Sequence, residues 1–225
     1  AGDDISFPKR TQILYNYWQS NRNKVFAITS SMIGIDSEGN PCKITDRFFE
    51  QKIYRLNIED FYTKYTWCGA GAAYDRKLYD LFGKIIYNFN EDRAYINRCW
   101  LIGSTMLVND ILLKYRFGGV STNKSNFVAF RKRDAFWFIN SYKQLQSDII
   151  NAKVKISNRT DIYIKKEIEY WLYRYDLYNH SCLYKKLHIL FCLFKKFGYA
   201  RNRLLPIYIL PQKLVNKIYS TFKMR

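Results

Sequence analysis

The spacing of apolar residues near the start of the chain predicts a helix followed by a buried strand. From about Pro8 to Ser20, apolar positions recur every three to four residues, which is the period of one helix face. That face consists of Ile13, Leu14, Tyr17 and Trp18. The run from Val25 to Asp36 is instead rich in β-branched and small residues and ends in the turn sequence Ser37 to Asn40. These features are typical of a buried strand.

Further along the chain, a run of small residues is followed by a short predicted helix. The small residues from Gly69 to Ala73 leave room for a ligand or for close approach of another backbone. Tyr74 to Phe82 has helical spacing, and Gly83 suits the end of that helix. We expect a short strand at Lys84 to Tyr87.

A second clear helix start follows at Asn90, whose side chain suits an N-cap, with Glu91 and Asp92 in the first turn. The helix dipole stabilises acidic residues there by roughly 0.3 to 1 kcal/mol, so helix initiation alone could explain them. A further strand is expected at Asp110 to Arg116, and beyond Asn126 the pattern is helical almost to the end. The predicted fold class is therefore α/β, followed by a mostly helical C-terminal region.

The composition of the chain indicates an anionic partner. The chain has 225 residues, of which 48% are hydrophobic and 18% aromatic, enough to fill a core. Its 37 Lys and Arg against 19 Asp and Glu give a net charge of +18. Such a charge favours nucleic acid, an acidic membrane surface or phosphorylated substrates, without choosing among them.

The cysteines and the apolar runs exclude some classes of protein. Five widely spread cysteines without a CxxC pair, and only two histidines, make a zinc site improbable and favour reduced thiols. The longest apolar runs, Leu187 to Phe194 and Leu204 to Leu210, are far shorter than the ~20 residues that span a bilayer. We expect no transmembrane segment.

The chain opens on an acidic pair, Asp3 and Asp4, directly before the first helix. Adjacent carboxylates repel each other unless a cation lies near them, and divalent ions such as Mg²⁺ and Mn²⁺ prefer oxygen ligands and bridge to phosphates. The alternative is an exposed turn that helps to start the helix opened by Ser6 and Pro8.

Taken in order, five segments resemble the second half of a family 2 glycosyltransferase with the GT-A fold. They are GDDISFPKR, the strand ending in ID with SEGN, GAGAAYDRKLYDLFG, EDRAYINRCWLIG and YRFGGVS. The resemblance covers Ala1 to about Asn123. It implies a partial GT-A, Rossmann-like domain over residues 1–123 and leaves residues 124–225 as a basic, aromatic, helical C-terminal region.

The resemblance also implies catalytic roles. Asp4, with Asp3, occupies the place of the family's DxD motif, which binds Mn²⁺ or Mg²⁺ and through it the diphosphate of a nucleotide-sugar donor. Gly2 stands where DxD has its first aspartate, so Asp4 is the better candidate for the metal ligand. Glu91 and Asp92 match the family's ED pair, which makes Asp92 the general base of an inverting transfer, kept ionised by the helix dipole.

Further residues match segments that line the family's donor and acceptor pocket. These substrate-binding candidates are Trp67, Gly69, Ala70, Gly71, Arg98, Trp100, Tyr115 and Arg116. For Trp67, a place in the core is an equally good interpretation. The QxxRW motif of processive synthases is absent, since the chain has Asn97-Arg98-Cys99-Trp100, so the resemblance implies a hexosyltransferase type of enzyme that adds a single sugar.

In the GT-A fold the nucleotide-binding half precedes the acidic pair, and three βα units imply about 90 residues upstream of Ala1. We therefore expect the 225 residues alone to be inactive, to bind donor poorly and to expose a sheet edge. Which sugar, nucleotide and acceptor the enzyme uses stays open at this point.

The C-terminal region has two interpretations. Its paired lysines, at 165/166, 185/186 and 195/196, alternate with apolar and aromatic runs, as in helices that lie on anionic membranes. An ordinary helical appendage with a solvated lysine face is the alternative. The resemblance favours a cytoplasmic, peripheral enzyme of bacterial surface polysaccharide synthesis, with a glycan or lipid-linked sugar as acceptor.

Two other classes of function stay open. A nucleic-acid-binding module would use the +18 charge and the 20 tyrosines and 16 phenylalanines, although no RRM or KH signature is present. It predicts salt-dependent binding of DNA or RNA, whereas the enzyme predicts metal-dependent affinity for a nucleotide sugar. The second alternative is a non-catalytic fragment without a donor site.

Overall fold

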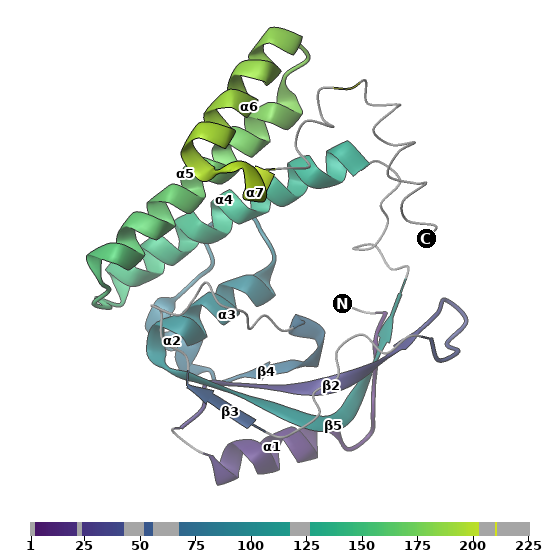
Figure 1. Cartoon of the computed structure of the whole chain (residues 1–225). Helices are drawn as coiled ribbons and strands as arrows, with labels where there is room; N and C mark the ends of the chain where they lie inside the picture. Colours follow the sequence, from purple (N-terminus) through teal and green to yellow (C-terminus); the bar gives the residue numbers. More distant parts are fainter. Residues whose placement is uncertain are drawn as a thin grey trace. The chain divides into compact units, whose positions relative to one another are not determined.

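The chain divides into two units that interleave along the sequence (Figure 1). The computed structural model describes residues 3–21, 24–42, 52–55, 68–117, 127–202 and 210. The first unit comprises residues 1–86, 90–123 and 144–160, and the second comprises residues 87–89, 124–143 and 161–225. The domain boundary expected between residues 123 and 124 lies outside the described residues.

The first unit is built on a mixed five-stranded sheet with the order β1-β5-β2-β4, in which β3 also pairs with β5. The strands are β1 (Ile5–Ser6), β2 (Ala27–Ile35), β3 (Lys52–Arg55), β4 (Ala72–Tyr74) and β5 (Ser104–Arg116). β2 and β5 are parallel, from Ala27 opposite Thr105 to Ile35 opposite Arg116, and the other pairs are antiparallel. The sheet and the helices that follow it confirm the predicted α/β class with a helical C-terminal region.

Helices cover both faces of this sheet. Figure 1 shows α1 (Arg10–Ser20) on one face and α2 (Lys77–Phe82) and α3 (Glu91–Ile102) on the other. Because β2 lies between β5 and β4 and is covered on both faces, every residue of β2 except Ile33 is buried. This burial confirms the predicted buried strand, which is rich in β-branched and small residues. Its polar residues Thr29, Ser30 and Ser31 are buried as well. The core on the α1 side contains Leu14, Val25, Ile28, Met106, Val108 and Leu112.

Three predicted elements differ from the structure. The helix expected from Tyr74 begins only at Lys77, because Ala72–Tyr74 pairs with β2 as an edge strand. The strand expected at residues 84–87 is absent from this described stretch, since Gly83 turns the chain with φ 70° and the Ile86 N–H donates to the Gln144 side chain at 2.9 Å.

β5 is also longer than expected and begins at Ser104 instead of Asp110. Polar residues interrupt the apolar pattern of its first half, but the structure gives them partners. The buried Thr105 hydroxyl donates to the Ala27 carbonyl at 3.1 Å, and Asp110 accepts a hydrogen bond from the Tyr17 hydroxyl at 2.7 Å.

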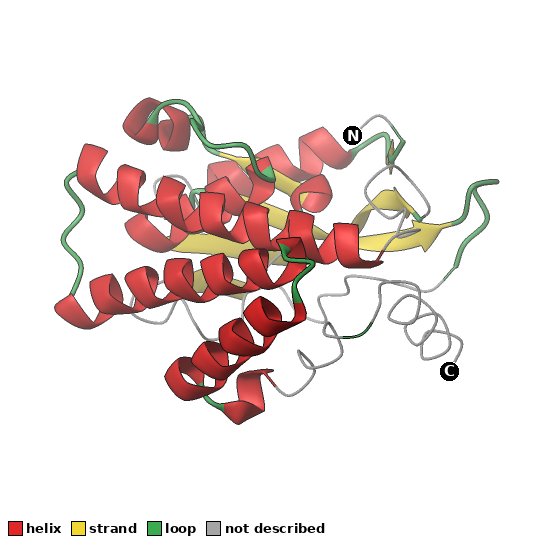
Figure 2. Cartoon of the chain, turned by 90° about the horizontal axis from the view of Figure 1, so that it is seen from above, coloured by secondary structure: helices red, strands yellow, loops and turns green. Residues whose placement is uncertain are grey.

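The second unit is helical (Figure 2). Its helices are α4 (Phe127–Asn151), α5 (Asn158–Asn179), α6 (Leu183–Phe197) and α7 (Tyr199–Asn202), of which α4 and α5 begin or end in the first unit. Its core contains Ala135, Tyr170, Leu177, Tyr178, Ile189, Leu190 and Leu193. The helical pattern predicted beyond Asn126 is confirmed as far as Asn202. In the part of the chain that is described, no helix has the length and apolar character needed to cross a membrane.

A buried ion pair links α3 to the end of α4 within the first unit. Arg98 Nε donates to Asp148 Oδ2 at 2.9 Å and Nη2 donates to Oδ1 at 3.2 Å, and both side chains are fully buried. Nη1 donates to the Gly83 carbonyl at 3.0 Å, and Gln144 donates to the same Asp148 carboxylate at 2.9 Å. Each charge therefore has several partners, which compensates for the loss of its hydration.

We predict that Arg98→Met lowers the free energy of unfolding by about 3 to 5 kcal/mol, because it leaves the Asp148 carboxylate buried without a cation. The double variant Arg98→Met/Asp148→Leu should recover part of this loss. Arg76→Met is the matched control, since the Arg76–Asp80 pair has side chains that are 87% and 58% exposed. It should change stability by less than about 1 kcal/mol in urea unfolding. An equal loss in the two arginine variants would contradict the prediction.

Candidate functional site

The acidic pair lies where the parallel strands β2 and β5 end. Arg116, the last residue of β5, donates its N–H to Asp4 Oδ1 at 2.9 Å, and its Nε donates to the Asp3 carbonyl at 3.0 Å. Its Nη1 donates to the carbonyls of Asp36 and Ser37, which follow β2, at 2.8 and 2.7 Å. One arginine thus holds together the acidic pair and the turn after β2.

The third carboxylate at this edge, Asp36, is used by its own turn. Asp36 Oδ1 accepts the Asn40 N–H at 2.8 Å, and this hydrogen bond lowers the pKa of Asp36. The predicted turn at residues 37–40 is therefore confirmed, and Asp36 has a structural reason for its position. Asp3 and Asp4 are both half-buried.

Arg10 connects the acidic pair with the small-residue loop. Its Nη1 donates to the Ser6 hydroxyl at 3.1 Å, and its Nη2 donates to the Ala70 carbonyl at 2.7 Å. Burial lowers the pKa of Arg10, whereas the negative charge of Asp4 opposes that change. The guanidinium therefore lies within electrostatic reach of Asp4 while it is bonded to the loop.

Asp92 lies on the other side of this loop. It is in the first turn of α3, and its Oδ2 accepts the Gly69 N–H at 3.3 Å while its Oδ1 accepts the Arg93 N–H at 2.7 Å. A Cβ on Gly69 would lie 2.5 Å from Asp92 Cβ, so only glycine fits against this carboxylate. Gly71 lies close to β2, where a Cβ would be 3.0 Å from the Ser30 carbonyl oxygen.

Burial raises the pKa of Asp92, and the hydrogen bonds from Arg93 and Gly69 offset that effect only in part. Desolvation therefore outweighs these hydrogen bonds, and the Asp92 carboxylate is a stronger base than an exposed aspartate. Glu91, which precedes it, is exposed to solvent.

Two predicted substrate-binding residues are in the interior. Arg98 is fully buried in its pair with Asp148, and Trp100 is 4% exposed. Both side chains are packed inside the first unit, so neither is accessible to a ligand from solvent. Tyr115 is half-buried and lies edge-on to Phe117, with ring centroids 5.7 Å apart. Trp67 lies outside the described residues.

The acidic pair fits a divalent cation that is shared with phosphate groups. Throughout the described ranges, no group of three or more His, Cys, Asp and Glu side chains is arranged to hold a metal ion. Mg²⁺ in nucleotide enzymes is usually bound by one or two carboxylates together with substrate phosphates. Asp4 and Asp3 match that mode, whereas a cation cage made of protein ligands would need more of them.

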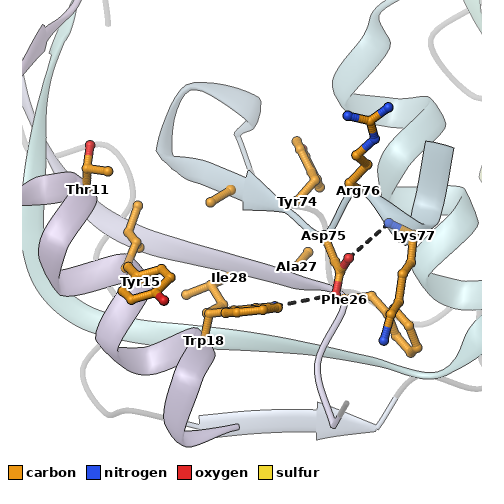
Figure 3. Close-up of a pocket in the computed structure, with 12 residues that line it drawn as sticks. Thr11, Tyr15, Trp18, Phe26, Ala27, Ile28, Tyr74, Asp75, Arg76 and Lys77 are labelled. Atoms are coloured by element: carbon orange, nitrogen blue, oxygen red, sulfur yellow. Dashed lines mark hydrogen bonds between the residues drawn. The ribbon is translucent and has the colours of Figure 1, made fainter. Parts of the chain in front are cut away.

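A pocket of about 530 Å³ lies elsewhere in the first unit, between α1, β2 and β4 (Figure 3). Tyr15, Trp18 and Ile28 contribute apolar surface, and the Trp18 indole N–H donates to Asp75 Oδ2 at 3.4 Å. Among the described residues that line it, none belongs to the predicted site. Its mainly apolar walls suit an apolar or aromatic group better than a diphosphate.

Sequence reasoning missed Arg10, and a signal for it was present. A cation in the first turn of a helix opposes the helix dipole, which favours negative charge there. Arg10 begins α1, so its position is unfavourable unless the guanidinium has partners outside the helix. The partner of Arg98, Asp148, could not be found in this way, because its position on α4 carries no local signal.

We predict opposite pH dependences for two carboxylates. Because the folded-state pKa of Asp92 is raised, its ionisation costs stability, and the stability of wild type relative to Asp92→Asn should fall as the pH rises from 3 to 7. Asp36 has a lowered pKa, so wild type should gain stability over Asp36→Asn across the same range. Thermal unfolding at several pH values measures both, and slopes of the same sign would contradict the prediction.

Comparison with known proteins does not assign the chain to a family. The sequence matches no protein-family model, and no curated protein is significantly similar to it. The functional argument therefore depends on the residues of the site themselves.

Proposed function

We propose that the protein is a metal-dependent, inverting glycosyltransferase that transfers a sugar from a nucleotide-diphosphate sugar to a hydroxyl acceptor. The observation that supports it is a loop that two candidate site elements contact: Arg10 donates to the Ala70 carbonyl, and Asp92 accepts the Gly69 N–H. The negative charge of Asp4 acts on Arg10, so the acidic pair is connected to this loop through Arg10, and Asp92 is connected to it directly. The roles of the acidic pair and of Asp92 were assigned from the resemblance of the sequence to family 2 enzymes.

The diphosphate would bind at the acidic pair. A Mn²⁺ or Mg²⁺ ion bound there would neutralise the charge of the departing nucleoside diphosphate. Asp4, with Asp3, would hold that cation. The guanidinium groups of Arg10 and Arg116 add positive charge near the pair, which would favour an anionic ligand such as a diphosphate.

Asp92 would act on the acceptor. Its carboxylate takes the proton of the acceptor hydroxyl as that oxygen attacks the anomeric carbon, while the bond from this carbon to the diphosphate oxygen breaks. Attack opposite to the leaving group inverts the anomeric configuration. The raised pKa of Asp92 makes it a stronger base in its ionised form, and positioned bases contribute about 10²- to 10⁴-fold.

The acceptor and the location are part of the same proposal. A glycan or a lipid-linked sugar at the cytoplasmic face of a bacterial membrane suits an enzyme of surface polysaccharide synthesis. Gly69 allows the small-residue loop to pack directly against Asp92, and Tyr115 lies next to Arg116 at the end of β5. The missing QxxRW pattern supports the addition of one sugar per acceptor.

The test of this function is turnover of a panel of nucleotide sugars by the full-length protein with Mn²⁺ and a lipid acceptor extract. Wild type should turn over one donor, and Asp92→Asn should lose about 10²-fold or more in kcat. Asp161→Asn is the matched control, because Asp161 occupies the first turn of α5 as Asp92 does that of α3. It should keep full activity.

Failure of wild type to use any donor, in a folded protein, would overturn the proposal. Strong salt-dependent binding of DNA or RNA in its place would favour the nucleic-acid-binding alternative. Absence of both activities would favour a non-catalytic fragment.

A second prediction concerns Gly69, which we assign as a positioning residue. Gly69→Ala would displace Asp92, since the new methyl group would lie 2.5 Å from its Cβ. We expect kcat to fall by on the order of 10²-fold with little change in the KM for donor. Ala70→Gly, which removes a methyl group from the same loop without crowding Asp92, should lower kcat less than Gly69→Ala does. An unchanged kcat in Gly69→Ala, or a rise in donor KM alone, would contradict this role.

A further inference from the structure

Helix α6 is apolar on two faces, and only one of them is used inside the second unit. Ile189, Leu190 and Leu193 are buried in the core of this unit with Tyr170 and Leu177 of α5. A helix with a single such face would be an ordinary surface helix. The remaining surface of α6 needs a separate explanation.

The second face exposes four large apolar side chains. Leu183, Tyr184, Leu187 and Phe191 are 53%, 78%, 48% and 64% exposed. Leu183, Leu187 and Phe191 follow one another at intervals of four residues, so they form one stripe along the helix, with Tyr184 beside it. Single exposed apolar residues are ordinary, but a continuous stripe of this kind marks a surface that binds something.

The charges of α6 indicate what binds there. The helix sequence LYKKLHILFCLFKKF contains four lysines and no acidic residue. Lys195 continues the stripe one step beyond Phe191, and Lys185 is exposed in the first turn of the helix, to one side of the stripe. Lys196 forms an ion pair with Glu169 of α5. Positive charge is therefore placed at one end of the exposed apolar stripe and beside its other end.

We propose that α6 docks the second unit onto an anionic lipid surface, lying in the plane of the membrane interface. Lysine is depleted in the cores of protein interfaces, whereas lysines around an exposed row of Leu, Phe and Tyr are typical of interfacial helices. The apolar stripe would enter the acyl boundary, and the lysines would contact anionic headgroups. With 15 residues, α6 is shorter than the ~20 that would cross a bilayer.

This inference does not rest on sugar transfer. It concerns α6 alone, and its test uses vesicles without any donor or acceptor. Sugar transfer without lipid binding would refute this inference and leave the proposed function intact. Lipid binding without sugar transfer would refute the proposed function and leave this inference intact.

The experiment is flotation of the full-length protein with vesicles of phosphatidylcholine alone or with 30 mol% phosphatidylglycerol, a composition chosen as roughly that of an anionic leaflet. We expect binding to the anionic vesicles that weakens with salt. Leu187→Ser/Phe191→Ser and Lys185→Gln/Lys195→Gln should each lower the affinity about tenfold or more. Because these side chains are exposed, thermal unfolding should be unchanged.

Matched controls come from α4 and α5. Ile162→Ser removes an aliphatic side chain that is 44% exposed on α5, and Lys143→Gln removes an exposed lysine of α4. Both should bind vesicles like wild type. Equal vesicle binding by all variants, or vesicle binding that does not depend on lipid charge, would overturn the proposal. A dimer that Leu187→Ser/Phe191→Ser dissociates, without any vesicle binding by wild type, would assign the stripe to a second copy of the chain.

Discussion

The parallel pairing of β2 with β5 is the constraint on which the first unit depends. Parallel strands end at the same edge of a sheet, so the residues after β2 and the last residue of β5 must meet there. At this edge, the Arg116 side chain donates hydrogen bonds to carbonyls of the turn after β2 and to the Asp3 carbonyl. β1, which is only two residues long, is thereby fixed against β5, and the acidic pair is fixed with it. Without that pairing, Asp4 would be an ordinary residue at the start of a chain.

Charge balance is the second theme of this region. Asp4 accepts a hydrogen bond from the main-chain N–H of Arg116 and interacts electrostatically with Arg10. Arg10 is in turn hydrogen-bonded to the loop that contacts Asp92. Negatively and positively charged side chains thus lie close together here, although not all of them form side-chain ion pairs. This arrangement suits a ligand that brings its own negative charge and a divalent ion. In the second unit, the exposed Lys185 and Lys195 of α6 have a different setting, because they lie near an apolar stripe.

Local sequence signals predicted the elements that depend on local physics. A run rich in β-branched and small residues predicted β2, helical spacing predicted α1, and Asn90 with the acidic residues after it predicted the start of α3. Asn90 occupies the N-cap position, but its side chain makes no capping hydrogen bond. Elements that depend on distant partners were missed or misplaced. Ala72–Tyr74 is a strand only because β2 offers it a free edge, and the polar first half of β5 is tolerated only because its side chains find partners across the sheet. The same limit explains why Arg98 was expected at the site, since its buried partner Asp148 lies far along the chain.

We propose that Asp4 binds the cation and diphosphate, whereas Asp92 acts on the acceptor. The most direct measurement is calorimetric binding of a nucleoside diphosphate to the full-length protein with and without Mn²⁺, for wild type, Asp4→Asn and Asp92→Asn. We expect affinity that depends on Mn²⁺ in wild type and in Asp92→Asn, and loss of that dependence in Asp4→Asn. Equal Mn²⁺-dependent affinity in all three proteins, or binding that ignores Mn²⁺ in wild type, would contradict it.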